Sequence, residues 1–174
     1  AENWLNKGLS IITKELREQF YSDGMHFEKS FMYHSLLLED LLDLINIFKV
    51  YDLEKYRLEC EFIASKAMSC LETFCHPDGE IPFFNDATFG VAASKNSLLK
   101  YYRLLNLCTD SSYTKTNHII SNGYVRSINS AAYLLCDIGD IGPNYIPSHA
   151  HADSLSFELS LFGDRVIVNS GISE

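Results

Sequence analysis

The sequence predicts an α+β protein whose helices and strands occupy separate parts of the chain. Up to about residue 107, apolar residues recur every three or four positions, which is the spacing of one helix face. Beyond Asp110 that spacing gives way to short runs of β-type residues bounded by turn residues. This order indicates two segregated units rather than alternating strand–helix–strand units. We place the units at residues 1–112 and 113–174, because a Ser- and Thr-rich connector lies near Asp110 to Thr116.

Four helices are expected in the first unit. The first runs from Trp4 to Phe20 with apolar and charged residues on opposite sides, and the turn residues Asp23-Gly24 follow its end. The second, from about Glu28 to Phe48, is apolar on nearly every side, so it is expected to be packed on nearly every side. A third runs from Leu53 to Phe74 and a shorter fourth from about Asn96 to Leu107. Their short connections favour antiparallel helical hairpins.

Four strand-like runs are expected in the second unit. They span Ile119 to Ile128, Ala131 to Asp137, Ser154 to Phe162 and Arg165 to Ser170. The last two flank Gly163-Asp164, a pair of residues typical of a two-residue hairpin turn. The second unit is therefore predicted to be antiparallel.

Charge and hydropathy exclude two classes of partner. The formal net charge of -9 argues against a nucleic-acid partner, which requires a basic surface. The most apolar stretch, Leu36 to Phe48, contains Glu39, Asp40 and Asp43, so no membrane span is expected. Because the chain opens within a helical pattern and stops just after a strand-like run, we interpret it as part of a longer protein.

Two histidines and an aspartate form the first candidate site. If residues 149–153 are extended, the period of two places His149, His151 and Asp153 on one face, with alanines between them. Imidazole and carboxylate groups donate lone pairs to a divalent metal or take part in proton transfer. The alternative is a pair of surface histidines near a turn.

A second group of polar residues lies at the start of the apolar second helix. It includes Glu28, Tyr33 and His34. The positive end of a helix dipole favours negative charge there, for example a tyrosinate. The alternative is that Tyr33 and His34 are core residues whose polar tips are hydrogen-bonded.

These stretches, with two others, resemble the heparinase II/III-like polysaccharide lyases. The ordered motifs are Asp23-Gly24-Met25-His26-Phe27-Glu28-Lys29-Ser30-Phe31-Met32-Tyr33-His34, His76-Pro77-Asp78-Gly79-Glu80-Ile81-Pro82 with Asn85-Asp86, Ser121-Asn122-Gly123-Tyr124, and His149-Ala150-His151-Ala152-Asp153 with Val166-Ile167-Val168-Asn169-Ser170-Gly171. The resemblance implies the last helices of an (α/α) toroid followed by the first strands of an antiparallel β-sandwich, with a substrate cleft between them. It also implies β-elimination of a uronic-acid-containing polysaccharide, in the periplasm or outside the cell.

The resemblance further implies roles for individual residues. Tyr33 matches the family's catalytic tyrosine, the acid toward the leaving oxygen and also a candidate base, and His149 matches a base or a charge partner of the tyrosine. Residues placed at the substrate are Glu28, His34, Asn85 and Asp86. Proximity in the sequence alone, rather than the resemblance, makes Lys29 and Arg126 candidate local cations for an anionic polymer.

A zinc site is the one cofactor that the resemblance implies. His151 matches a zinc ligand, and Asn169 stands where metal-binding relatives have an aspartate. An amide oxygen is a much poorer zinc ligand than a carboxylate, so Asn169 departs from the family pattern. Asp153 then becomes a supporting carboxylate rather than a ligand.

Two other functions remain open at this point. A glycoside hydrolase needs two carboxylates that flank the glycosidic bond, and Glu28, Asp78 and Asp86 are available without a spacing that pairs any two of them. A glycan-binding or polysaccharide-assembly protein that kept the fold and lost the activity is the non-enzymatic reading, which Asn169 favours.

Overall fold

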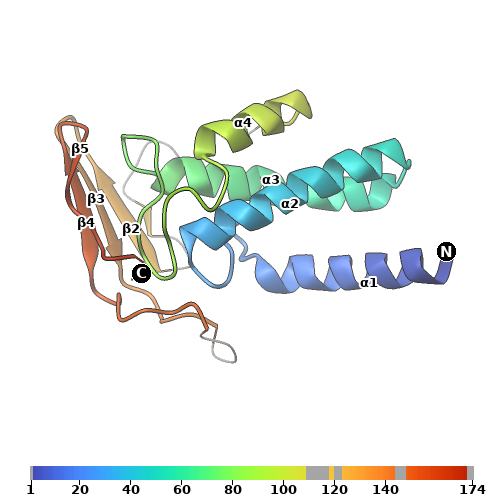
Figure 1. The fold of residues 1–174 in the computed structure, drawn as a ribbon, viewed down its shortest axis with the longest axis horizontal. Coiled ribbons are helices and arrows are strands. Elements are labelled where there is room, and N and C mark those ends of the chain that lie inside the picture. Colours follow the sequence, from blue (N-terminus) through green and yellow to red (C-terminus); the bar gives the residue numbers. More distant parts are fainter. Residues whose placement is uncertain (1, 109–117, 120–122, 144–147, 172–174) are drawn as a thin grey trace.

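Helices gather at one end of the molecule and strands at the other (Figure 1). The computed structural model describes residues 2–108, 118–119, 123–143 and 148–171. The elements in these residues are α1 (Glu2–Gln19), α2 (Phe31–Val50), α3 (Glu54–Phe74), α4 (Lys95–Leu104), β1 (His118–Ile119), β2 (Tyr124–Ile128), β3 (Ala132–Asp137), β4 (Phe157–Leu161) and β5 (Asp164–Ile167). The predicted α+β class, with helices before strands, is confirmed. The predicted boundary between residues 112 and 113 lies outside the described residues.

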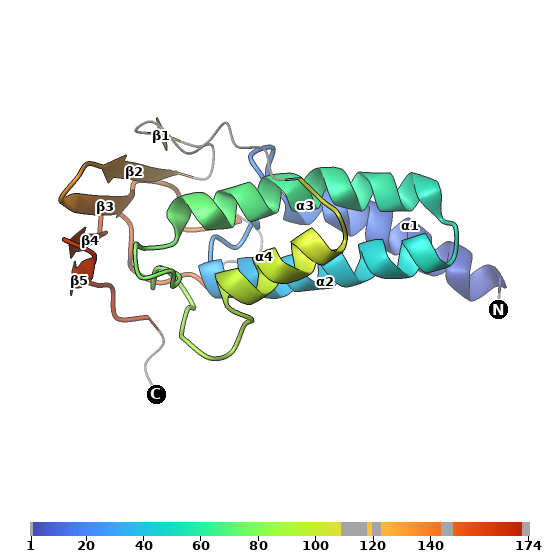
Figure 2. The same ribbon diagram turned by 90° about the horizontal axis from the view of Figure 1, so that it is seen from above.

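The long helices α2 and α3 form the centre of the helical end, with α1 and α4 packed against them (Figure 2). Helix α2 begins at Phe31 rather than near Glu28, because Ser30 caps it: the Ser30 Oγ accepts a hydrogen bond from Tyr33 N at 3.3 Å. Glu28 therefore lies in the preceding loop, and Tyr33 lies in the first turn of the helix. In the described part of the chain, no helix combines the length and the apolar character that a membrane span requires.

The strands form one antiparallel sheet in sequence order, β1-β2-β3-β4-β5. In the β4–β5 hairpin Leu161 pairs with Asp164, so the turn residues are Phe162 and Gly163. Both have positive φ, 54° and 99°, which the tight mirror-image turn of a two-residue hairpin requires. The predicted turn, Gly163-Asp164, is therefore displaced by one residue, because the glycine occupies the second turn position.

The segment before β4 differs from the prediction. Residues 149–153 do not form a strand, and β4 begins at Phe157 rather than at Ser154. A turn intervenes, in which Ser156 N donates to Asp153 O at 2.8 Å and Leu155 has a φ of 67°. The expectation that His149, His151 and Asp153 share one strand face is therefore wrong, since alternation of faces holds only in extended backbone.

Aromatic packing joins the sheet to the helices. The fully buried Tyr124 of β2 contacts Phe31 of α2 and Phe84 of the loop after α3, each at 5.2 Å between ring centroids. Its hydroxyl donates to Lys29 O at 3.0 Å. The hydrophobic core is thus continuous from the helices into the inner face of the sheet. This fixes the loops at the junction, where the candidate site lies.

Candidate active site

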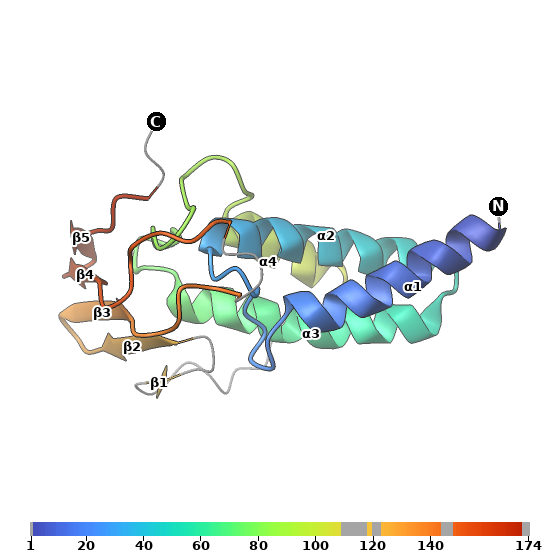
Figure 3. The ribbon, with the colours of Figure 1, turned by 90° about the horizontal axis from the view of Figure 1, so that it is seen from below.

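The first turn of α2 meets the segment before β4 at Tyr33 and His149. Their ring centroids lie 4.2 Å apart with an interplanar angle of 43°. Figure 3 shows the segment before β4 passing beside the start of α2. The His149 side chain is 27% exposed, so the pair is open to a ligand while still held by packing. The structure thus brings together the two residues predicted to be catalytic.

Asp86, in the loop between α3 and α4, contacts both histidines of the His-x-His stretch. Its Oδ2 lies 2.8 Å from His149 Nδ1 and its Oδ1 lies 3.0 Å from His151 Nε2. On the other side of the His149 ring, Nε2 lies 3.8 Å from the Glu28 carboxylate. Two carboxylates therefore flank the His149 imidazole, and both come from segments predicted to form the site.

Asn85 is buried and fixes the loop by hydrogen bonds. It is 2% exposed, and its backbone N–H donates to the buried carboxylate of Asp153. Its side-chain oxygen accepts from His151 N at 3.2 Å, and its amide donates to Lys29 O at 3.3 Å. These contacts give Asn85 a structural role next to Asp86 and lend no support to its predicted place at the substrate.

His34 is also buried, contrary to its predicted place at the substrate. It is fully buried, and its Nε2 bonds to Ala67 O of α3 at 2.9 Å. Its Nδ1 accepts from the backbone N–H of His26 at 3.2 Å. Successive helical residues point about 100° apart, so when Tyr33 faces the β4 segment, His34 faces α3. This is the core arrangement that the sequence left open as an alternative.

The two buried histidines make stability depend on pH. Burial lowers the pKa of His26 from 6.5 to about 3 and that of His34 to about 4, whereas the unfolded chain keeps the ordinary value. Because the folded state resists protonation, stability is full above pH 6.5 and falls as the pH drops below it. We expect about 2 kcal/mol to be lost per histidine between pH 7 and pH 5. Urea unfolding at both pH values measures this, and His26→Gln should remove about half of the slope; an unchanged slope in that variant would contradict it.

The charges at the site keep Tyr33 protonated. Burial raises the pKa of the Tyr33 phenol, and the Asp86 and Glu28 carboxylates raise it further. For Asp86, burial opposes ionisation, but hydrogen bonds and attraction from His149 and His151 hold its pKa below the ordinary value. In the resting site Tyr33 is therefore a neutral proton donor and not the tyrosinate considered from the sequence.

The two predicted local cations do not reach the site. Lys29 is 5% exposed and its Nζ donates to Asp140 O at 2.6 Å. Arg126 is likewise 5% exposed and donates to Thr73 O at 2.9 Å. Both side chains stabilise backbone carbonyls at the junction between helices and sheet.

The described residues do not fit the zinc site that the resemblance implies. His151 turns to Asp86, whereas the Asn169 amide donates to Ser156 Oγ at 3.2 Å and its oxygen accepts from Ser170 N at 2.7 Å. Over the part of the chain that the structure describes, no group of three or more His, Cys, Asp or Glu residues is arranged to hold a metal.

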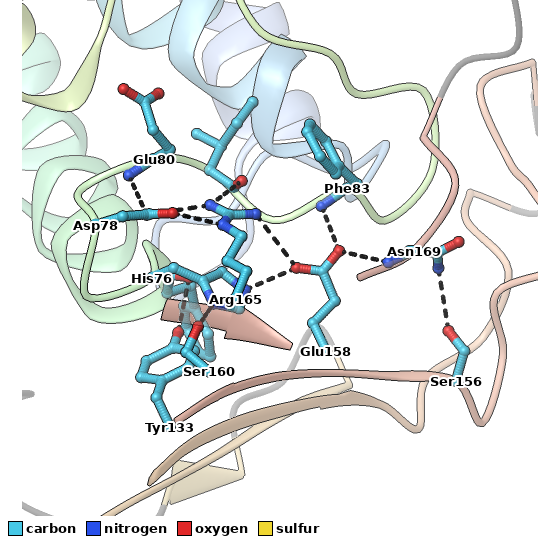
Figure 4. Close-up of polar contacts among 12 residues, drawn as sticks. His76, Asp78, Glu80, Phe83, Tyr133, Ser156, Glu158, Ser160, Arg165 and Asn169 are labelled. Carbon is cyan, nitrogen blue, oxygen red and sulfur yellow. Dashed lines mark hydrogen bonds and ion pairs between the residues drawn. The ribbon is translucent and has the colours of Figure 1, made fainter. Parts of the chain in front are cut away.

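A buried carboxylate that the sequence analysis missed ties the site loop to the sheet (Figure 4). Glu158 of β4 is fully buried, and its Oε2 lies 2.7 Å from His76 Nε2. Its Oε1 accepts from Phe83 N at 2.8 Å and from Asn169 N at 3.0 Å, and Arg165 of β5 lies 3.7 Å from Oε2. We call these groups the Glu158 cluster. Its sequence signal is a glutamate within the apolar run of β4.

The junction between helices and sheet corresponds to a known pair of domains. The model of the heparinase II/III N-terminus matches residues 1–106, and the heparinase II/III-like C-terminal model matches residues 115–174. The chain belongs to the heparinase II/III family. Among curated relatives, a heparin-sulfate lyase of Bacteroides thetaiotaomicron is 29% identical over 71% of this chain and 18% of its own length. One of Pedobacter heparinus is 23% identical over 99% of this chain and 28% of its own length.

Solved structures of the family share this fold. The heparan sulfate lyase HepC of Pedobacter heparinus superposes with a TM-score of 0.73 at 21% identity, over 98% of this chain and 29% of that one. A heparinase III gene product superposes with a TM-score of 0.75, also at 21% identity, over 98% and 29%. The chain therefore spans less than a third of the length of each of these relatives.

Proposed function

We propose that this chain contributes part of the active site of a polysaccharide lyase that cleaves a uronic-acid-containing polymer by β-elimination. The observation that carries the proposal is the contact between Tyr33 and His149, with His149 held by Asp86. A proton donor and a proton acceptor are thereby placed side by side in a partly open site. This is what removal of a C5 proton and departure of the O4 oxygen require.

In the proposed reaction His149 is the base and Tyr33 the acid. With Nδ1 directed at Asp86, the His149 nitrogen that can accept the C5 proton is Nε2. The C5–H electrons form the C4–C5 double bond, the C4–O4 bond breaks, and the Tyr33 phenol protonates O4. The raised pKa of the Tyr33 phenol supports the donor role. Asp86 and Glu28 then stabilise the imidazolium until proton transfer restores both groups.

The same geometry weighs against a glycoside hydrolase. Such an enzyme needs a sugar ring between its two carboxylates. Here the space between Glu28 and Asp86 contains the His149 ring, 3.8 Å from one carboxylate and 2.8 Å from the other. The third candidate, Asp78, is paired with Arg165 at 2.7 Å. Elimination, which needs an imidazole and a phenol, suits the residues better.

The first polymer to test is heparan sulfate, because the curated relatives are named heparin-sulfate lyases. Full-length protein should be incubated with heparan sulfate, other glycosaminoglycans, alginate and bacterial exopolysaccharides, while the absorbance of unsaturated uronate is followed. We expect cleavage of at least one polymer, and we place the protein in the periplasm or outside the cell, where such polymers lie. Cleavage that adds one water per cut, measured by mass spectrometry, would indicate a hydrolase. Binding without cleavage would indicate a glycan-binding protein.

A further inference from the structure

Asp86 is held in one position by contacts from two segments, the residues before α2 and those before β4. Its backbone N–H donates to His149 O at 3.1 Å, and its carbonyl accepts from Ser30 Oγ at 2.5 Å. The preceding residue, Asn85, also fixes the loop. Its backbone N–H donates to the Asp153 carboxylate, and its side-chain oxygen accepts from the backbone N–H of His151. The Asp86 side chain is therefore directed at the two histidines by backbone that cannot readily shift.

Both oxygens of the Asp86 carboxylate are used by imidazoles, but by different ring nitrogens. Oδ2 meets Nδ1 of His149 at 2.8 Å, and Oδ1 meets Nε2 of His151 at 3.0 Å. A carboxylate that is ionised at neutral pH only accepts hydrogen bonds, so each of these nitrogens must carry the proton. When both histidines are neutral, their tautomers are therefore opposite, with the proton on Nδ1 in His149 and on Nε2 in His151.

We propose that Asp86 is a positioning residue that sets the orientation and the tautomer of His149 and holds His151 in the same site. Its effect on turnover rests on the proposed lyase function, whereas its effect on the tautomers does not. With the proton on Nδ1, the Nε2 lone pair of His149 faces the Glu28 side of the ring, where a substrate proton could be taken. Asp86 itself is unsuited to binding a uronate directly, because its carboxylate would repel the carboxylate of the sugar.

The proposal also gives His151 a role. A single imidazole on one carboxylate oxygen leaves the carboxylate free to rotate about its last bond. A second imidazole on the other oxygen removes that freedom, so His151 fixes the plane of the carboxylate on which His149 depends. In this chain His151 acts through Asp86 and His149.

The test is Asp86→Asn in the full-length protein, with Asp43→Asn as the matched control. Asn offers one oxygen and one N–H donor group in place of two acceptors, so it cannot accept from both rings. We expect kcat to fall about 100-fold with KM changed less than about threefold, because proton transfer is lost while binding is kept. Asp86→Glu should recover at least a tenth of the lost rate, since it restores a carboxylate. Asp43 pairs with Tyr101 on the helices, away from the site, and its variant should keep full activity.

Nitrogen NMR of histidine-labelled protein, assigned with single His→Gln variants, provides a measurement independent of activity. We expect neutral His149 to be protonated at Nδ1 and His151 at Nε2, and at least one of the two to change in Asp86→Asn. Protonation of His149 at Nε2 in the wild type would overturn the proposal. So would an unchanged kcat with a raised KM in Asp86→Asn, which would make Asp86 a substrate ligand. If no polymer is cleaved, the lyase proposal fails, and the proposal for Asp86 is then tested only by the histidine tautomers measured by NMR.

Discussion

Replacement of Tyr33 by phenylalanine is expected to abolish turnover while leaving polymer binding intact. The phenylalanine ring keeps the packing against His149, whose centroid lies 4.2 Å away, but it has no proton for the leaving oxygen. General acid catalysis contributes about 100- to 10,000-fold, so we expect kcat to fall by at least about 100-fold. The measurement is the rate of unsaturated uronate formation at saturating polymer, together with binding by calorimetry.

Tyr101→Phe is the matched control for this variant. Tyr101 donates to Asp43 at 2.7 Å on the helical surface, and its removal tests whether loss of any partly exposed tyrosine hydroxyl affects activity. We expect unchanged kcat and KM. An active Tyr33→Phe enzyme would exclude Tyr33 as the acid. Loss of binding in Tyr33→Phe would instead identify the phenol as a substrate contact.

Replacement of Glu158 by alanine is expected to produce the largest loss of stability. The carboxylate is fully buried. It is hydrogen-bonded to His76 and to two backbone N–H groups, and it forms an ion pair with Arg165. Removing one partner of a buried ionic group leaves the others without compensation, which costs about 3–5 kcal/mol. Urea unfolding of the full-length protein, followed by fluorescence and circular dichroism, measures the change.

Two further variants show whether the effect comes from the buried charge. Glu59→Ala removes a carboxylate that pairs with the exposed Arg17 at 2.9 Å, and such surface pairs contribute about 0–1 kcal/mol. Glu158→Gln retains an oxygen for the two N–H groups, so we expect its loss to lie between those of the two alanine variants. A Glu158→Ala protein as stable as Glu59→Ala would contradict the assignment of Glu158 as the link between loop and sheet.

Much of the fold could be predicted from local patterns. The helical spacing predicts the four helices of the described residues, and in α2 it also predicts a buried apolar face, which includes Leu38, Leu42 and Ile45. In α1 the structure buries only part of the predicted face, Leu9 and Leu16, and leaves Trp4 exposed. The errors lie at the boundaries of elements and in the predicted run from Ile119 to Ile128, because Ile119 belongs to β1 and Tyr124–Ile128 to β2, which pair antiparallel. The predicted start of α2 missed the cap at Ser30, and the predicted strand from Ser154 missed the turn at Leu155. A cap or a turn depends on one residue, which the surrounding periodicity does not reveal.

The site was only partly predictable, because it is assembled from distant segments. The sequence motifs selected Tyr33, His149 and Asp86, which the structure brings together. They also selected His34 and Asn85, which are buried. A motif contains both the residues that face a ligand and those that fix the backbone beneath them. Which residues do which depends on how α2 is rotated and on which segments the loop between α3 and α4 contacts.

Glu158 shows what a single sequence leaves undecided. A glutamate in an apolar strand signals a buried charge, but its partners come from α3's following loop and from β5. Only the folded chain shows that His76, Arg165 and two backbone N–H groups converge on it (Figure 4). The Glu158 cluster also includes the backbone N–H of Asn169, a residue that the resemblance assigned to a metal site.

The most direct test of the account is the product that the full-length wild-type protein forms from heparan sulfate and the other uronate polymers. Elimination through His149 and Tyr33 predicts chain ends with a C4–C5 double bond, seen as ultraviolet absorbance that rises with each cut and is absent in Tyr33→Phe. Cleavage without that double bond, or the same absorbance from the Tyr33→Phe protein, would contradict it.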